Sequence, residues 1–298
     1  MRLIEPFKII LVMFLWAICF PLIVAGFAYA PHLTFATLRA LVAGAALLAV
    51  GLALGRPMPR GVRVWVMLAF VGFGATSLAF LGMFHAAEFV SPGIATVIAN
   101  TQPLLAAVLA GSFLGEYLDL RGKLGLALGF GGIVFIAAPE LFTAQGESYA
   151  LGIAYILLAA LGITFSNLLI RRIAGQIDAI MGMGIQMLIG SVPLGIAALV
   201  LEEPSSVDWS MSFVIILLAL SLFGSSLAYW LWSSVLEKTE LNRANAYSFL
   251  VPIFGLSMGA LFFGETLAWP DYIGIALTLA GIALVTSKRQ PQAVMGTT

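Results

Sequence analysis

Long apolar stretches alternate with short polar connections along nearly the whole chain of 298 residues. Many of these stretches approach about 20 residues, the length with which an α-helix crosses a bilayer, whereas a buried strand needs only about 4 to 8. Proline, glycine and charge clusters separate the stretches. The pattern predicts an all-α integral membrane protein with ten transmembrane helices at residues 7–30, 33–54, 63–87, 92–114, 122–138, 150–170, 179–201, 211–236, 242–263 and 271–287.

Composition supports a membrane location. The chain is 61% hydrophobic and only 9% charged, whereas soluble domains carry about 25% charged residues. The first apolar run covers 20 residues from Ile9 to Ala28. Because the apolar core of a signal peptide has only about 7 to 15 residues, we expect this run to be the first transmembrane helix. The connections are too short for a soluble domain, so function is expected within the membrane.

Charged residues are divided unevenly between the two sides of the predicted membrane. With the N-terminus inside, all Lys and Arg residues except Arg39 fall on the cytoplasmic side. The outer segments contain Asp and Glu but no Lys or Arg. This distribution follows the positive-inside rule and predicts that both termini are cytoplasmic. We expect a multi-pass protein of a bacterial inner membrane. The net charge of zero argues against a nucleic-acid partner.

The second half of the sequence repeats the first at an offset of 149 residues. The clearest match pairs "FLGEYL", which ends at Leu118, with "FFGETL", which ends at Leu267. The offset divides the chain into residues 1–149 and 150–298, with five predicted helices in each half. An odd number of spans gives the two halves opposite orientations, so the sequence predicts two inverted five-helix repeats. Such repeats are typical of secondary transporters that work by alternating access around a central site.

Four segments resemble the paired EamA domains of the drug/metabolite transporter superfamily. They read "LWAICF", "TLRALVAGAAL", "QPLLAAVLAGSFLGEYL" and "VPIFGLSMGALFFGETL". The resemblance covers nearly the whole chain. It implies a ten-helix transporter of small metabolites, commonly an exporter of amino acids or related molecules, and the exporters of aromatic amino acids are one branch.

Two other classes of protein remain as alternatives to a transporter. One is an intramembrane enzyme that acts on a lipid or a small apolar substrate, and the other is a channel. An enzyme would need clustered carboxylates or a nucleophile with a base, and apart from Arg39 the predicted spans have no charge near their centres. No phosphate-binding loop is present, and we expect no cofactor. The expected partners are a small-molecule substrate and the lipid bilayer, and the oligomeric state stays open, with a monomer as one option.

Arg39 is the main candidate for binding a substrate. It lies about six residues inside the outer end of its predicted helix, or roughly 9 Å deep. Three roles are open: the side chain extends outward to water, it binds backbone carbonyls freed at a helix kink, or it binds an anionic group of the substrate through two parallel hydrogen bonds.

Other candidates are uncharged side chains away from the helix ends. Polar and aromatic groups inside a membrane are expected to face the bundle interior, where they bind a substrate or join helices. The substrate-binding candidates of this kind are Trp16, Thr96, Asn100, Gln186, Ser226, Trp230 and Tyr247. His85 and Glu88 share a helix face, but no further ligand joins them, so no metal site is expected.

Pro103 and Pro252 occupy equivalent places in the two repeats. Each is expected to kink its helix by removing a backbone hydrogen bond, to the carbonyl of Ala99 or of Ser248. The paired kinks are candidate hinges, with static packing as the alternative.

Overall fold

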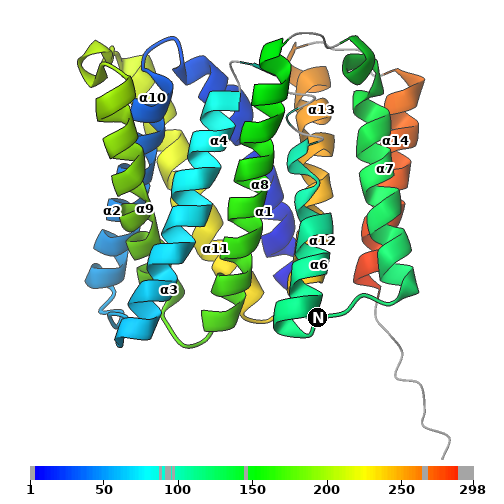
Figure 1. The fold of residues 1–298 in the computed structure, drawn as a ribbon, viewed down its shortest axis with the longest axis horizontal. Coiled ribbons are helices and arrows are strands. Elements are labelled where there is room, and N and C mark those ends of the chain that lie inside the picture. Colours follow the sequence, from blue (N-terminus) through cyan, green and yellow to red (C-terminus); the bar gives the residue numbers. More distant parts are fainter. Residues whose placement is uncertain are drawn as a thin grey trace, which may run out of the picture.

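The structure is a computed structural model that describes residues 4–86, 89–90, 95, 98–143, 147–263 and 268–287. Within these ranges every regular element is a helix. Figure 1 shows the helices standing side by side in one bundle, with most of them roughly parallel or antiparallel. The all-α architecture predicted from the sequence is confirmed.

The helices of the first half alternate with short connections. They are α1 (Ile4–Gly26), α2 (His32–Ala53), α3 (Val62–Gly72), the π-helical segment η1 (Phe73–Leu78), α4 (Ala79–Ala86), α6 (Gln102–Leu114) and α7 (Leu120–Thr143). Because η1 joins α3 to α4 without a break, the three elements form one continuous span over Val62–Ala86.

The second half follows a similar order. Its elements are α8 (Glu147–Ile173), α9 (Ala179–Leu201), the 3₁₀ turn η2 (Pro204–Ser206), α10 (Met211–Ala219), the π-helical segment η3 (Leu220–Leu227), α11 (Ala228–Leu236), α12 (Leu241–Ala246), the 3₁₀ turn η4 (Tyr247–Phe249), α13 (Leu250–Phe263) and α14 (Trp269–Thr286).

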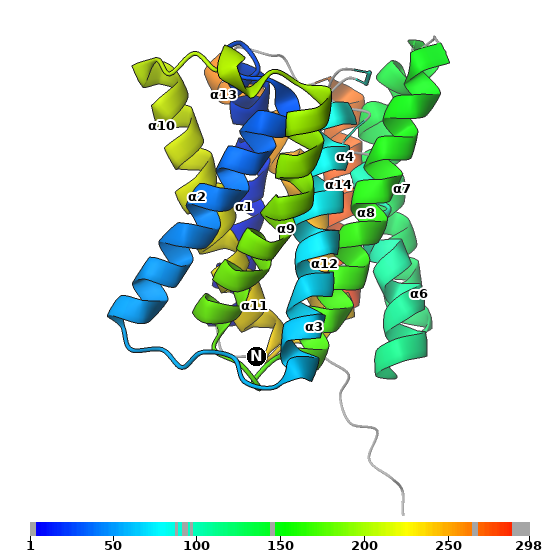
Figure 2. The same ribbon diagram turned by 60° about the vertical axis from the view of Figure 1, so that its left-hand side comes forward.

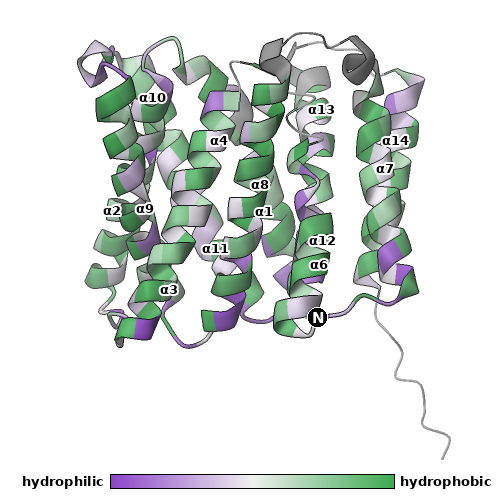
Figure 3. Cartoon of the chain, in the orientation of Figure 1, coloured by the Kyte–Doolittle hydropathy of each residue, from purple (hydrophilic) through white to green (hydrophobic). Residues whose placement is uncertain are grey.

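Seven helical spans among the described residues are long and apolar enough to cross a membrane. They comprise α1, α2, α3–η1–α4, α8, α9, α10–η3–α11 and α14. The three remaining predicted spans correspond to α6, α7 and the segment α12–η4–α13. Apolar residues dominate the middle of the bundle in Figure 3, and hydrophilic ones gather toward the ends of the helices. The chain is a multi-pass membrane protein, and the count of ten spans stays a prediction.

Element boundaries recur at the offset of the sequence repeat. Residues 149 apart begin three pairs of helices: α3 and α10 at Val62 and Met211, α4 and α11 at Ala79 and Ala228, and α7 and α14 at Leu120 and Trp269. A π-helical segment stands at the corresponding place in each half. The inverted orientation of the two halves stays a prediction.

Helices that correspond by this offset also pack against each other. The most extensive contacts join α7 to α14 and α2 to α9. Figure 1 shows α7 beside α14 at the edge of the bundle, and in the turned view of Figure 2 α14 lies partly hidden behind α4 and α8. Glycines allow the close approach there: a Cβ atom on Gly132 would lie 2.6 Å from the backbone oxygen of Gly274 and 2.5 Å from the Thr278 hydroxyl. The bundle is therefore built in part from helix pairs that join the two halves.

Substitution of Gly132 by alanine is expected to lower the free energy of unfolding by about 1 kcal/mol, because the added methyl group forces α7 and α14 apart. The measurement is thermal unfolding of the purified protein in detergent. Gly131→Ala on the same helix is the matched control, since a Cβ atom on Gly131 meets nothing within 4 Å. Equal stability of the two variants would contradict the importance of this contact.

Candidate substrate-binding site

Arg39 lies on α2 and is enclosed by three other elements. Its side chain is buried, with 4% of the residue exposed. The Nε atom donates to the Ser225 hydroxyl at 2.8 Å, and one terminal nitrogen, Nη2, donates to the Gly224 carbonyl and to the Cys19 sulfur, each at 3.4 Å. The guanidinium carbon lies 4.7 Å from the centre of the Phe80 ring. Helices α1, α2 and α4 and the segment η3 thus meet at this one cation.

These contacts bear on each of the three roles considered for Arg39. The side chain is held inside the bundle by Ser225, Gly224 and Cys19, which does not fit the first role, extension outward to water. A backbone carbonyl does accept from the guanidinium, but it belongs to a π-helical segment and not to a proline kink. π-Helical turns occur frequently at functional sites. Among the described residues no carboxylate forms an ion pair with Arg39, so binding of an anionic substrate stays open.

A second group of buried polar and aromatic residues lies beside Trp16. The Trp16 ring is 6.1 Å from the Tyr229 ring and 5.5 Å from the Trp232 ring. Trp232 donates through Nε1 to the Asn167 side-chain oxygen at 2.8 Å, and the Tyr229 hydroxyl donates to the Ala75 carbonyl at 2.9 Å. We call Trp16, Asn167, Tyr229 and Trp232 the aromatic cluster.

Trp16 connects the aromatic cluster to the surroundings of Arg39. Its ring packs against the hydrophobic core around Trp232 and also against the core that contains Cys19 and Phe80. Trp16 therefore contacts both the aromatic cluster and the hydrophobic residues around Arg39.

Three buried amides, Asn167, Gln186 and Asn245, have donor nitrogens without hydrogen-bond partners among the described residues. The Gln186 oxygen accepts from the Thr76 hydroxyl at 2.9 Å, but its Nε2 has no hydrogen-bond partner among the described residues. The Asn167 oxygen is occupied by Trp232, and its Nδ2 likewise has none. Buried polar groups normally form hydrogen bonds, and exceptions are frequent at functional sites. All three amides therefore have a donor available for a ligand.

The chain is interrupted at corresponding places before Pro103 and Pro252. Asn100 and Thr101 form a turn, and α6 begins at Gln102. In the second half, α12 ends at Ala246, the 3₁₀ turn η4 follows, and α13 begins at Leu250. The kinks expected inside continuous helices are thus helix starts. The physical reason is that proline fits the first turn of a helix, where its missing N–H has no partner to lose.

Sequence comparison identifies the family. The EamA-like transporter family matches residues 4–138 and 150–287. The chain belongs to this family. It is 31% identical to an uncharacterized transporter of Synechocystis sp., over 97% of the chain and 90% of that protein. A WAT1-related chloroplastic protein of Arabidopsis thaliana is 32% identical over 84% of the chain, which covers 61% of that longer protein.

Two further comparisons bear on function and fold. A probable amino-acid metabolite efflux pump of Escherichia coli is 28% identical, over 92% of the chain and 91% of that protein. A solved structure titled "Crystal structure of protein" superposes with a TM-score of 0.83 at 20% identity, over 96% of the chain and 99% of that structure. The latter shows the fold alone. The protein is a membrane transporter of the EamA-like family.

The remaining candidates of this EamA-family transporter are spread over the bundle. Ser226 is buried and donates to the carbonyls of Ala43 and Ser221, at 2.9 and 3.0 Å. Asn100 is buried in the turn before α6, and Tyr247 is half-buried at the start of η4. Trp230 is 37% exposed, on the opposite side of α11 from the buried Trp232. Thr96 lies outside the described residues.

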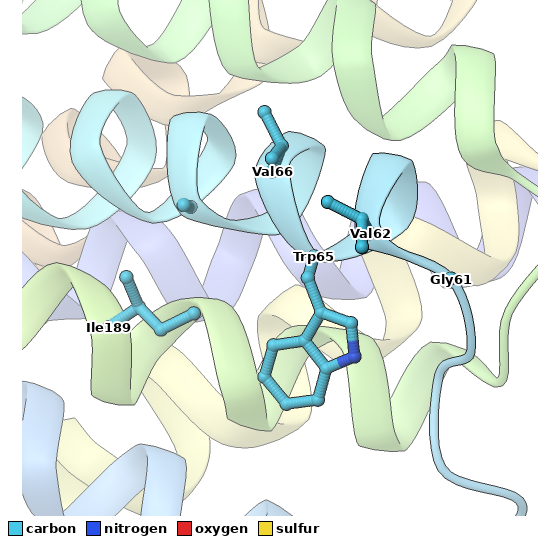
Figure 4. Close-up of a pocket in the computed structure, with 6 residues that line it drawn as sticks. Gly61, Val62, Trp65, Val66 and Ile189 are labelled. Atoms are coloured by element: carbon cyan, nitrogen blue, oxygen red, sulfur yellow. The ribbon is translucent and has the colours of Figure 1, made fainter.

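Among the described residues, neither a metal site nor the surface cavity beside α3 is a good candidate for binding a polar substrate. Among the described residues, no group of three or more His, Cys, Asp or Glu side chains could hold a metal ion. A cavity of about 580 Å³ opens at the surface beside α3, and Figure 4 shows Trp65, Val62 and Val66 around it. Its lining is apolar, and no charged or amide side chain contributes to it. It is therefore a poor candidate for a polar metabolite.

A set of bonds at one end of the bundle could not be predicted from the sequence alone. Glu116, which follows α6, forms an ion pair with Arg171 of α8 at 3.1 Å and accepts from the backbone N–H of Leu241 at 2.7 Å. The Asn242 side chain donates to the Glu116 carbonyl at 2.8 Å, and Arg171 donates to the Leu236 carbonyl at 2.8 Å. We call this set the Glu116 junction. Its signal in the sequence is the Gly-Glu pair that both halves share.

The described carboxylates of the transporter lie at helix ends or in connections. At the end of α1, Glu5 pairs with Lys8 at 4.0 Å and with Lys238 at 3.6 Å. Burial raises the pKa of the nearby Glu237 above its ordinary value, and Lys238 partly offsets the shift. Arg39 therefore meets no negative charge of the described chain at its own depth.

Proposed function

We propose that this transporter exports amino acids or related carboxylate-bearing metabolites across the bacterial inner membrane. It does so by alternating access of two inverted repeats, residues 1–149 and 150–298. Amino-acid export is suggested by the name of the Escherichia coli relative, a probable amino-acid metabolite efflux pump. Aromatic amino acids are the first candidates, because Trp16 and Tyr247 offer rings for stacking.

One observation carries the proposal. Each half contains a helix that is interrupted immediately before a proline, and the two prolines, Pro103 and Pro252, lie 149 residues apart. Discontinuous helices in corresponding halves are the usual position of substrate sites in secondary transporters, because the interruption frees backbone groups near the bilayer midplane.

The buried polar and aromatic side chains described above suggest a division of roles. Arg39 binds the carboxylate of the substrate, since a guanidinium holds a carboxylate by two parallel hydrogen bonds. Asn167 and Gln186 supply amide donors, and Trp16 supplies an aromatic surface. No described span carries a carboxylate near its centre, and proton-driven carriers commonly use one. We therefore propose facilitated transport or exchange.

The direct test is a panel of labelled amino acids and cationic drugs offered to proteoliposomes that contain the purified protein. A carrier gives flux that saturates with substrate concentration and releases the substrate chemically unchanged. Flux that rises linearly would indicate a channel, and a modified product would indicate an enzyme.

Replacement of Pro103 or Pro252 by alanine is expected to slow transport several-fold without loss of expression. Alanine allows the helix to continue through the interruption and so favours one orientation of the transporter. Pro193→Ala is the control, because Pro193 is exposed and lies inside α9. Unaltered rates in both single variants and in the double variant would leave only a packing role for the two prolines.

A further inference from the structure

A cavity of about 150 Å³ lies between α1 and the continuous segment α10–η3. Its wall is apolar apart from one thiol, and its lining includes Leu15, Ile18, Cys19, Ala219, Phe223 and Gly224. Phe223 is 56% exposed, so the cavity begins at the outer surface of the bundle. An enclosed apolar cavity of about this size accepts a compact apolar group such as benzene, and this one has the volume for a group of that size on its open side.

Arg39 stands directly behind the cavity wall. The two wall atoms that it touches are the Cys19 sulfur and the Gly224 carbonyl, and both contacts are made by Nη2. A Cβ atom on residue 224 would collide with the Cys19 sulfur and would lie 3.5 Å from Nη2. Glycine at this position therefore makes room for the Cys19 sulfur, which contacts the guanidinium beside the cavity.

The contacts of the guanidinium differ in strength. The bond from Nε to Ser225 is short, at 2.8 Å, whereas the two contacts of Nη2 are 3.4 Å long. Bonds between a charged donor and a carboxylate are about 2.7–2.9 Å long and roughly twice as strong as neutral ones. A carboxylate can thus replace the two weak contacts of Nη2 while Ser225 keeps the guanidinium in place.

We propose that this cavity is the side-chain pocket of the substrate site and selects substrates that combine a carboxylate with a compact apolar side chain. The carboxylate binds Nη2 of Arg39 beside Gly224, and the apolar side chain fills the cavity between α1 and α10–η3. Amino acids such as valine, leucine, methionine and phenylalanine fit this description, and those with a charged side chain do not. The inference rests on the proposed function and adds the determinant of substrate choice.

The first test fills the cavity. Ala219→Leu places three more carbon atoms in the pocket, and its matched control is Ala69→Leu, a half-buried alanine of α3 that lines the other surface cavity. In proteoliposomes Ala219→Leu is expected to lower kcat/KM for leucine and phenylalanine at least tenfold and that for alanine and glycine less than twofold. Ala69→Leu is expected to leave all four unchanged.

The outcomes separate the inference from the proposed function. If the wild-type protein transports no amino acid, the proposed function fails. If it transports amino acids but Ala219→Leu lowers all four rates equally or none, the side-chain pocket is overturned. A wild-type preference for amino acids with charged side chains would overturn it as well.

The second test does not depend on transport. Cys19 is the single cysteine of the chain and lines the cavity, so a small apolar maleimide reports access to it. Leucine is expected to slow labelling of the wild-type protein, and leucinamide, which lacks the carboxylate, is expected to have little effect. Equal protection by both compounds, or protection by phospholipid alone to the same degree, would assign the cavity to an apolar chain such as that of a lipid and overturn the proposal.

Discussion

Arg39→Gln is expected to lower transport of carboxylate-bearing substrates by about 10- to 100-fold, because hydrogen bonds to a charged group contribute about 1.5–3 kcal/mol. Arg39→Lys is expected to retain part of the activity, since lysine keeps the positive charge but cannot form two parallel bonds. The measurement is kcat/KM for each labelled amino acid in proteoliposomes, together with the amount of folded protein inserted. Glutamine can still bond to Ser225, so we expect the variant to fold.

The control for Arg39→Gln removes a positive charge elsewhere. Arg63→Gln is suitable, because Arg63 is exposed at the start of α3. If Arg39→Gln transports amino acids as well as the wild-type protein, Arg39 has only a structural role through Ser225 and Gly224. The substrate site would then have to lie in the aromatic cluster.

Glu116→Ala is expected to lower the free energy of unfolding by about 2 to 4 kcal/mol. The substitution removes the bond to the first N–H of α12, which resembles the loss of a helix cap at about 1 kcal/mol. It also leaves Arg171 without its ion-pair partner. Loss of one partner of a fully buried pair costs about 3–5 kcal/mol. Because the Arg171 and Glu116 side chains are still 27% and 13% exposed, the loss of this ion pair is expected to cost less than that. Thermal unfolding in detergent measures the change.

A double-mutant cycle separates the ion pair from the cap. Arg171→Ala in the Glu116→Ala background is expected to cost less than Arg171→Ala alone, by about 1 kcal/mol or more. Glu240→Ala is the matched control, because Glu240 also lies at the start of α12 but forms an exposed pair with Arg243. If Glu116→Ala is no more destabilising than Glu240→Ala, the Glu116 junction does not hold this end of the bundle together.

The positions of the helices could be predicted from the sequence wherever hydrophobicity alone determines them. Each long apolar run forms a helix over the residues that the structure describes, because backbone groups in a bilayer can be satisfied only within the segment itself. The π-helical segments η1 and η3 have no such signal, since their altered hydrogen bonding depends on neighbours such as Tyr229, which binds the Ala75 carbonyl. The prolines mark the interruptions correctly but do not reveal that helices start there.

The candidate site is only partly visible in the sequence. Arg39 stands out because it is a charge in an apolar run, but its bond to Ser225 joins residues 186 apart and depends on the packing of α2 against η3. Trp230 and Trp232 lie on a helix that is apolar all round, so the sequence does not show that Trp232 is buried and Trp230 exposed. Asn167 is recognisable as an amide within an apolar span, but its bond to Trp232 joins residues 65 apart on α8 and α11 and so depends on helix packing.

Exchange across the membrane tests alternating access most directly. Proteoliposomes are loaded with an unlabelled amino acid that the protein transports, and the initial rate of uptake of the labelled form is compared with that into empty vesicles. The account predicts faster uptake into the loaded vesicles. A carrier changes from its inward-open to its outward-open state more quickly when a substrate occupies its binding site. Equal rates in loaded and empty vesicles, at saturating substrate, would contradict it.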